Sequence, residues 1–324
     1  MKTFLRLSTR NGATLKGYLL LLFFVFLVLS SCNTSEAPVI KPIEAAAWSK
    51  FDGKLISASN ALIFSFNSKT RSIDTLHRRP SSISYQIYGA FGMEVSYDKS
   101  RIIYSVYGGF NPQWGKVFSM RTDGSNNVAL LPNPAIMLSA AVENSVGSVA
   151  YFTGDYYQEA SNLWIDDKKI YDFKLGPYGN PSRFKLDWHP KENLLLMSLG
   201  DYKEGVWTCS LYGIQLPNID VKPILLAPAG SCYVSASYSP DGKKIVFLSF
   251  SNLTSKGAIC SVNSDGAEFM KIADAVFDSY PVWSPDGKKI AYTSNNGIYV
   301  ANADGSEASL VCKGYAARLI WLQE

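Results

Sequence analysis

The chain has 324 residues, of which 47% are hydrophobic and 13% aromatic, with a formal net charge of +4 at neutral pH. Four bases lie before residue 32, where there is no acid, so the remaining chain carries 27 basic and 27 acidic residues. A neutral body has no electrostatic footprint for nucleic acid, and we exclude that class of partner. The length suffices for one large domain, and the aromatic content favours short strands.

Residues 1–31 are typical of a signal peptide. Basic residues precede an apolar run over residues 17–29, which is shorter than the ~20 residues of a membrane span and matches a signal-peptide core. The run ends in Leu29-Ser30-Ser31-Cys32, which resembles a bacterial lipobox. Small residues there admit the signal peptidase, and Cys32 would supply the thiol that receives the lipid. An ordinary signal peptide or an uncleaved anchor is the alternative.

Asn33, rather than Asp, follows the cysteine. By resemblance to Gram-negative lipoproteins this favours the outer membrane, on either its periplasmic or its cell-surface side. Two or more acyl chains hold a protein firmly to a bilayer. Residues 32–47 are polar and then contain Pro and Ala without strand alternation, so we predict a tether there. The folded body is expected over residues 48–324.

Two copies of one pattern organise that body, Tyr238-Ser-Pro-Asp-Gly-Lys-Lys-Ile-Val-Phe247 and Trp283-Ser-Pro-Asp-Gly-Lys-Lys-Ile-Ala-Tyr292. Pro sets φ for the first corner of a turn, Asp caps its own backbone, and Gly takes the positive φ. An alternating apolar strand follows each turn. Repeats of this period indicate stacked or closed arrays, in which no unit buries its apolar faces alone.

At these residues the chain resembles the WD40-like repeat of TolB-type β-propellers. Degenerate copies place the aromatic marker of the repeat at positions 97, about 143, 188, 238, 283 and 321. Asp-Gly hairpins recur at residues 122–124, 264–266 and 303–305. The resemblance implies an all-β, six-bladed β-propeller, in which the C-terminal strand (residues 316–322) pairs with the first blade and closes the ring. Seven blades are the alternative if Trp48 opens a full repeat.

Charged residues recur at fixed offsets from the markers. Positions three residues before each marker include Glu94, Lys185, Tyr280 and Arg318, and positions five before include Arg183 and Asp278. We predict that these six side chains lie at the mouth of the central channel. They would bind a small anionic or zwitterionic ligand there, or else form a charge-paired, water-filled channel with no ligand.

Blade geometry puts the short turns on one face and the longer loops on the other. The long loops are rich in aromatic residues, and variable loops on a rigid scaffold usually carry binding. Wide aromatic rings suit a sugar, a peptide or a protein partner, although each ring could instead pack its own loop. The candidate residues on this loop face are Tyr88, Tyr107, Trp114, Tyr156, Tyr157, Tyr178 and Tyr202.

The sequence contains only His77 and His189, in distant repeats, so we expect no metal and no cofactor. No nucleophile elbow or phosphate loop is present. We therefore predict a monomeric, non-catalytic binding or scaffold propeller for an envelope protein or a glycan. The alternative is a carbohydrate-active enzyme of glycosidase or lyase type, with a carboxylate pair drawn from Glu94, Asp155, Asp201 and Asp278. The α/β domain that precedes the propeller of TolB is not recognised, so TolB's lipoprotein partner is not implied.

Four cysteines remain besides Cys32, at positions 209, 232, 260 and 312. Disulfides persist in exported proteins. Strand interiors in neighbouring blades seldom approach closely enough for a bridge, which favours buried free thiols. One disulfide involving Cys232 is the alternative.

Overall fold

The structure is a computed structural model that describes residues 45–58, 62–78, 93–106, 116–130, 142–154, 161–166, 168–173, 180–251, 256–276, 279–294, 297–314 and 318–324. The predicted signal peptide, Cys32 and most of the tether lie outside these residues. The described part is all-β apart from one 3-10 helix, η1 (Ala45–Lys50), and it holds no helix of a length and apolarity that would span a membrane. Ala47, in the last position of the predicted tether, is buried in the core.

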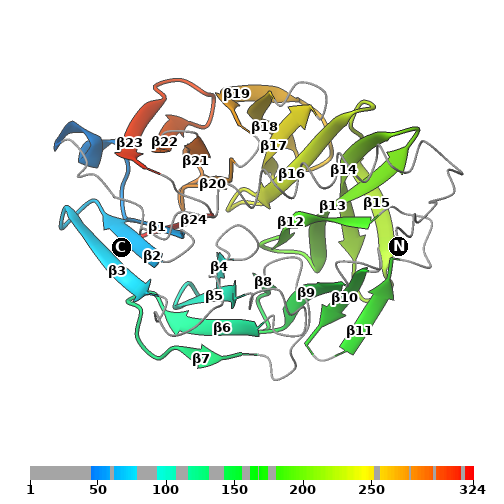
Figure 1. The fold of residues 1–324 in the computed structure, drawn as a ribbon, viewed down its shortest axis with the longest axis horizontal. Helices are drawn as coiled ribbons and strands as arrows, with labels where there is room; N and C mark the ends of the chain where they lie inside the picture. The colour runs from blue at the N-terminus through cyan, green and yellow to red at the C-terminus, as the bar shows by residue number, and fades with distance from the viewer. Residues whose placement is uncertain are drawn as a thin grey trace, which may run out of the picture. The chain divides into compact units, whose positions relative to one another are not determined.

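Three sheets are built from β1 to β11 in chain order, and the first of them also includes the C-terminal strand β24 (Figure 1). The first has the order β24-β1-β2-β3, with β24 at Leu319–Leu322, β1 at Lys54–Ala58, β2 at Leu62–Asn67 and β3 at Ser72–Arg78. The second contains β4 (Met93–Val95), β5 (Arg101–Val106), β6 (Lys116–Arg121) and β7 (Val128–Ala129). The third contains β8 (Val142–Glu143), β9 (Val149–Gly154), β10 (Ser161–Ile165) and β11 (Lys168–Asp172).

The remaining strands continue the same order. One group contains β12 (Asn180–Trp188), β13 (Leu194–Lys203), β14 (Val206–Gln215) and β15 (Asp220–Leu225), and the next β16 (Ser231–Tyr238), β17 (Lys244–Ser251), β18 (Gly257–Asn263) and β19 (Met270–Ala275). A single parallel pair between β14 and β16 joins these two groups into one sheet. The last sheet contains β20 (Pro281–Trp283), β21 (Lys289–Ser294), β22 (Gly297–Asn302) and β23 (Ser309–Lys313).

One strand from each group contacts its counterparts in the neighbouring groups. β4 contacts β8, β8 contacts β12, β12 contacts β16, β16 contacts β20, β20 contacts β24, and β24 contacts β4. The contacts of these six strands therefore form a cycle that returns to its start. We refer to them as the inner strands.

The C-terminal strand lies in the first sheet. β24 pairs antiparallel with β1, with Trp321 opposite Leu55. The Trp321 indole N–H donates to the Asp52 carbonyl at 2.7 Å. Trp48, the residue on which a seventh repeat depended, lies in η1 and packs against the core cluster that contains Trp321.

The Ser-Pro-Asp-Gly turns are held by a repeated set of hydrogen bonds. Ser239 Oγ donates to Asp241 Oδ1 at 2.6 Å and accepts from Lys244 N at 2.9 Å, and Gly242 has a φ of 79°. The turn at residues 284–289 repeats each of these features. In the degenerate copy, Ser96 and Asp98 keep the bonds, but Lys99 occupies the glycine position with a φ of 62°. The bonding pattern therefore does not require Pro or Gly.

Adjacent groups are joined through the marker tryptophans and the hairpin glycines. The Trp188 indole donates to the Val142 carbonyl on β8, and the Trp283 indole to the Ser237 carbonyl on β16. Gly266, at a φ of 88°, lies so close to the Ile224 carbonyl of the preceding group that a side-chain carbon would collide with it. Gly is therefore required there both by its φ and by this close approach.

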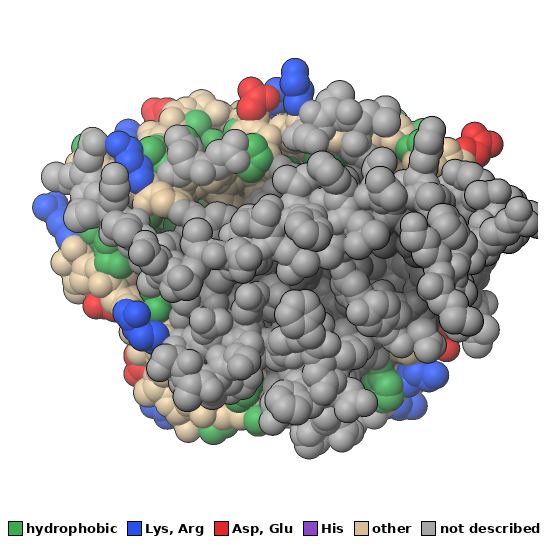
Figure 2. All heavy atoms as spheres, viewed as in Figure 1, with side chains coloured by type: hydrophobic (Ala, Val, Ile, Leu, Met, Phe, Trp, Pro, Cys, Tyr) green, Lys and Arg blue, Asp and Glu red, His purple; other side chains and the backbone are tan. Residues whose placement is uncertain are grey.

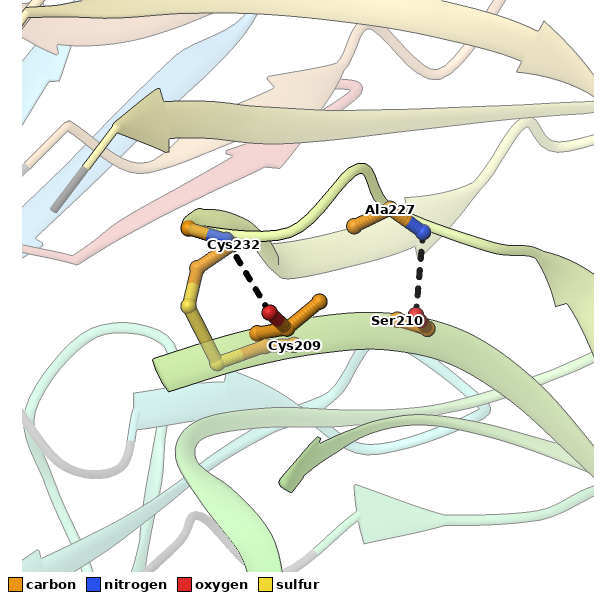
Figure 3. The surroundings of a disulfide bond; sticks show 6 residues. Cys209, Ser210, Ala227 and Cys232 are labelled. Atoms are coloured by element: carbon orange, nitrogen blue, oxygen red, sulfur yellow. Dashed lines mark hydrogen bonds between the residues drawn. A yellow bond between two sulfur atoms is a disulfide. The ribbon is translucent and has the colours of Figure 1, made fainter. Parts of the chain in front are cut away.

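The prediction of free thiols is wrong for two of the cysteines. Cys209 and Cys232 form a disulfide, with their Cα atoms 4.2 Å apart, whereas Cys260 and Cys312 are buried thiols (Figure 3). The cause is an uneven pairing of β14. β15 pairs only with Leu211–Gln215 of that strand, so its first half remains open for Cys232 of β16 to pair with Cys209.

The connection between β15 and β16 is tied to the same open edge. The Ala227 N–H donates to Ser210 Oγ at 3.0 Å (Figure 3). The Gly230 N–H donates to Thr208 Oγ1 at 3.1 Å. These bonds hold the connection alongside β14, which brings the second cysteine within reach of the first. The bridge that the sequence left as an alternative, one involving Cys232, is the one present.

Candidate functional site

A mostly buried group of polar side chains lies on the inner strands or directly before them, and we call it the central charged cluster. Its members are Glu94, Lys185, Asp187, Ser237, Tyr280 and Arg318. Lys185 Nζ lies 3.4 Å from Glu94 Oε1 and 3.3 Å from Ser237 Oγ. The two charged side chains come from β12 and β4, and each is buried. The cluster thus joins three inner strands, because Ser237 belongs to β16.

Burial dominates the electrostatics of the two carboxylates. Removal from water raises the pKa of Glu94, and the positive charges of Lys185 and Arg318 oppose that rise. Burial also raises the pKa of Asp187, opposed first by Lys185 and then by a hydrogen bond from the Tyr238 N–H at 2.7 Å. Each carboxylate raises the cost of ionising the other, so the lysine that both share is the main stabiliser of their charges.

The cationic part of the cluster includes a cation–π pair. The Arg318 guanidinium carbon lies 4.5 Å from the centre of the Tyr280 ring, and both residues are buried. The backbone of Tyr280 is held by a bond from its N–H to Thr293 Oγ1 at 3.0 Å. A desolvated guanidinium over an aromatic face is attracted by the ring quadrupole. The pair places a flat apolar surface beside the buried charges.

Four of the six predicted channel residues are described with their side chains: Glu94, Lys185, Tyr280 and Arg318. The structure brings all four into the central charged cluster. Arg183 lies within β12, where the structure describes its backbone. Asp278 lies outside the described residues.

The loop-face residues have a different outcome. Six of them lie outside the described residues: Tyr88, Tyr107, Trp114, Tyr156, Tyr157 and Tyr178. The seventh, Tyr202, was expected in a long loop, but it lies in β13 and pairs with Trp207 of β14. Glu204 and Gly205 connect these strands with φ values of 51° and 84°, as in a tight two-residue hairpin turn. The loop expected around Tyr202 is therefore a strand extension.

Sequence reasoning missed Asp187 and Ser237. Both lie one residue before a marker, and side chains two positions apart share a face of a strand. The period that selected Lys185 therefore also selects Asp187, and this was the available signal. Ser235, three before its marker, is 1% exposed with a φ of 56°, beside a register shift in β16. A strained, buried serine on an inner strand is a feature more common at functional sites than elsewhere.

The described residues contain no group of three or more His, Cys, Asp or Glu side chains arranged to hold a metal ion. The cluster instead combines two carboxylates, two cations and one phenol. Such a set places both signs of charge beside one aromatic face. On the molecule's surface, both signs of charge occur along the edge of the face in Figure 2, in keeping with the neutral composition of the body.

We compared the chain with known protein families and solved structures. No family model matches the chain. A solved structure of TolB from Acinetobacter baumannii superposes with a TM-score of 0.66 over 85% of this chain and 68% of that one, at 12% identity. The fold is TolB-like. The sequence-based recognition of a TolB-like propeller is thereby confirmed.

The TolB-like fold also has a short sequence match. The chain is 40% identical over 60 residues to the Tol-Pal system protein TolB of Francisella tularensis subsp. tularensis, which is 18% of this chain and 14% of that protein. The chain thus matches about one seventh of its curated relatives' length. A crystal structure of the tricorn protease also superposes, with a TM-score of 0.55 over 85% of this chain and 26% of that one, at 13% identity. The TolB-like fold therefore occurs in enzymes as well.

Proposed function

We propose that the chain is a cell-envelope lipoprotein whose body is a closed, six-bladed propeller that binds a protein or glycan partner without catalysis. The central charged cluster carries this proposal. A buried ion pair contributes little to stability compared with apolar packing, and breaking it is strongly destabilising. A propeller that only needed a stable core would be served by the apolar residues found at neighbouring positions.

The closed, six-bladed form is supported by the cycle of contacts among the six inner strands and by the pairing of β24 with β1. Closure leaves the inner ends of the sheets facing a common axis, where side chains from several blades can meet. This arrangement predicts contacts such as those of Lys185 on β12 with Glu94 on β4 and Ser237 on β16. The partner would reach the cluster from the mouth of the channel.

The class of partner follows from the chemistry of the cluster. Paired charges of both signs beside the Tyr280 ring suit a zwitterionic or hydrogen-bonding ligand. The TolB proteins to which the chain is similar are named for the Tol-Pal system, and their propeller fold supports a binding role in the envelope. The loop-face aromatics are proposed to widen the same surface.

Pull-down from cell envelopes tests the binding role. The full-length lipoprotein should retain a specific envelope protein or a glycan, and the double variant Glu94→Gln/Lys185→Gln should lose it. That variant keeps the side-chain sizes and removes both members of the ion pair together. The matched control, Lys169→Gln/Asp172→Asn, removes a partly exposed ion pair on β11 and should retain the partner.

A glycan array and a polysaccharide turnover assay complete the test. Saturable binding of a sugar with no co-purifying protein would identify a glycan as the partner. Turnover of a polysaccharide would contradict the non-catalytic proposal. If both double variants retained the partner equally, the central charged cluster would have no role in binding it. The anchor is tested separately, because palmitate labelling should disappear in Cys32→Ala.

A further inference from the structure

The turn side of the sheet β4–β7 contains a feature that departs from the repeat. In three other sheets, the ladder between the second and third strands of a group ends in a Lys paired with an Asn: Lys54 with Asn67, Lys244 with Asn263, and Lys289 with Asn302. In the last of these pairs, Lys289 Nζ donates to Asn302 Oδ1 at 3.3 Å. At the same place in β5–β6 the pair is Arg101 and Arg121.

The backbone of Arg121 has the same hairpin bonding as Asn263 and Asn302. Its N–H donates to the Ser125 carbonyl at 2.8 Å, as the Asn263 N–H does to Ala267 and the Asn302 N–H to Ser306. The hairpin that follows has the same Asp-Gly sequence. Like charges directly opposite one another on adjacent strands are destabilising. The second arginine is thus a local departure from the repeat that opposes stability, and such departures concentrate at functional sites.

The two arginines line one surface hollow of about 470 Å³, together with Ser100, Thr122, Asp123 and Asn126. A third base reaches its rim, because Lys54 Nζ donates to the Thr122 carbonyl at 3.2 Å. Acids engage part of this lining. Glu143 pairs with Arg101 at 3.2 Å, Asp98 accepts from Ser100 Oγ at 2.7 Å, and Asp123 accepts from the Ser125 N–H at 2.8 Å. Arg121 is exposed and has no ion pair within the described part of the chain.

We propose that this hollow binds an oxyanion group, with Arg121 as its main charged donor, Thr122 as its hydroxyl donor, and Arg101, which Glu143 holds, beside them. Guanidinium groups match the planar geometry of carboxylate and phosphate oxygens. A bound oxyanion would give Arg121 the opposite charge that Glu143 gives Arg101. Three other sheets have Asn at the position of Arg121 and need no such charge. The group can belong to a free oxyanion or to the carboxylates of an acidic protein segment. The site lies on the turn side and does not depend on the proposed central channel.

Calorimetric titration of the full-length protein in detergent at low salt tests the proposal, with inorganic phosphate and a capped tetraglutamate peptide as separate probes. The decisive variant is Arg121→Asn, which installs the residue found at this position in three other sheets. It should weaken binding by roughly tenfold to a hundredfold, as expected for lost charge-assisted bonds. The matched control, Arg71→Asn, makes the same charge change in the β2–β3 turn and should leave the affinity unchanged.

Melting temperatures provide a second readout. Without an anion, Arg121→Asn should melt higher than the natural protein, and a probe that binds should raise the melting temperature of the natural protein alone. Binding of phosphate only assigns a free oxyanion, and binding of the peptide only assigns an acidic segment. The proposal is overturned if neither probe binds, if both variants lose binding equally, or if Arg121→Asn melts lower.

Discussion

Lys185 Nζ lies 3.4 Å from Glu94 Oε1, although the two residues belong to different sheets and come together only through contacts among the inner strands. The same ammonium lies 3.3 Å from Ser237 Oγ of a third inner strand. Removing one charge from such a pair leaves the other buried and uncompensated, whereas removing both together does not. This asymmetry leads to the first prediction.

Lys185→Met should destabilise the protein by about 3 kcal/mol, and Glu94→Gln/Lys185→Met should be less destabilised than the sum of the single changes. Denaturant unfolding of the four proteins in the cycle measures this coupling. Additive effects of the two changes would contradict the importance of the pair. Each single change serves as the control for the double variant, so the separate effect of each substitution cancels from the coupling energy.

The effect of Lys185→Met should also depend on pH. The pKa of Glu94 is raised above its ordinary 4.5 by burial, so the folded state favours the protonated carboxyl and stability falls as pH rises from 4.5 through the folded-state value. Loss of Lys185 raises that pKa further, which extends the fall to higher pH. The variant should therefore be closest to the natural protein below pH 4.5 and furthest from it at neutral pH. Unfolding measured across this range gives the slope.

Lys99→Gly should stabilise the protein by about 0.5–1 kcal/mol. Lys99 has a φ of 62° in a turn whose other copies place Gly242 and Gly287 at this position. A side chain with a Cβ disfavours this conformation, and Gly removes the strain. The shift in urea midpoint measures the gain. The reverse change, Gly242→Lys, should destabilise more strongly, because a Cβ there would collide with the His189 ring.

His189→Ala should destabilise the protein by about 1–2 kcal/mol. His189 Nδ1 accepts the N–H groups of Lys191 and Glu192, at 3.3 and 3.0 Å, so it carries no proton and Nε2 donates to the Gly242 carbonyl at 3.2 Å. The ring therefore caps its own turn and binds the turn of the next group. It also packs edge-on against Tyr238, with centroids 4.8 Å apart.

The serine found at this position in other copies provides the control for His189. His189→Ser should restore the cap of its own turn but not the bond to Gly242, and so should lie between His189→Ala and the natural protein in denaturant stability. If the alanine and serine variants were equally stable, the capping role would be refuted.

Loss of the Cys209–Cys232 bridge should lower the stability by about 2–4 kcal/mol. The bridge closes a chain segment with a sequence separation of 23 and holds β16 to the open half of β14. Cys209→Ser/Cys232→Ser and chemical reduction of the natural protein should have the same effect on the melting temperature. Cys312→Ala serves as a cysteine control outside the bridge. Non-reducing peptide mapping should recover Cys209 and Cys232 in one linked species.

Much of the architecture could be predicted because the signals are local and repeated. Markers such as Trp283 and turns such as Ser284–Gly287 are set by a few neighbouring residues, and period-two alternation then assigns each inner-strand side chain to one face. The offset of three residues from the marker selected Lys185, Tyr280 and Arg318, which the structure places in one buried cluster with Glu94. Glu94 was selected by counting from Tyr97, but Ser96 occupies the turn position of Ser239, so Glu94 corresponds to Ser237.

The sequence by itself thus determined the repeat, its turns and the charged layer of the inner strands, because each depends on bonds between residues close in the chain. The tertiary structure alone decided which residues from different sheets meet. The bridge exists because the pairing of β15 with β14 stops at Leu211 and leaves the first half of β14 open. Tyr202 lies in a strand because a two-residue turn lets β13 and β14 continue. Strand lengths depend on packing between sheets, which no local pattern encodes.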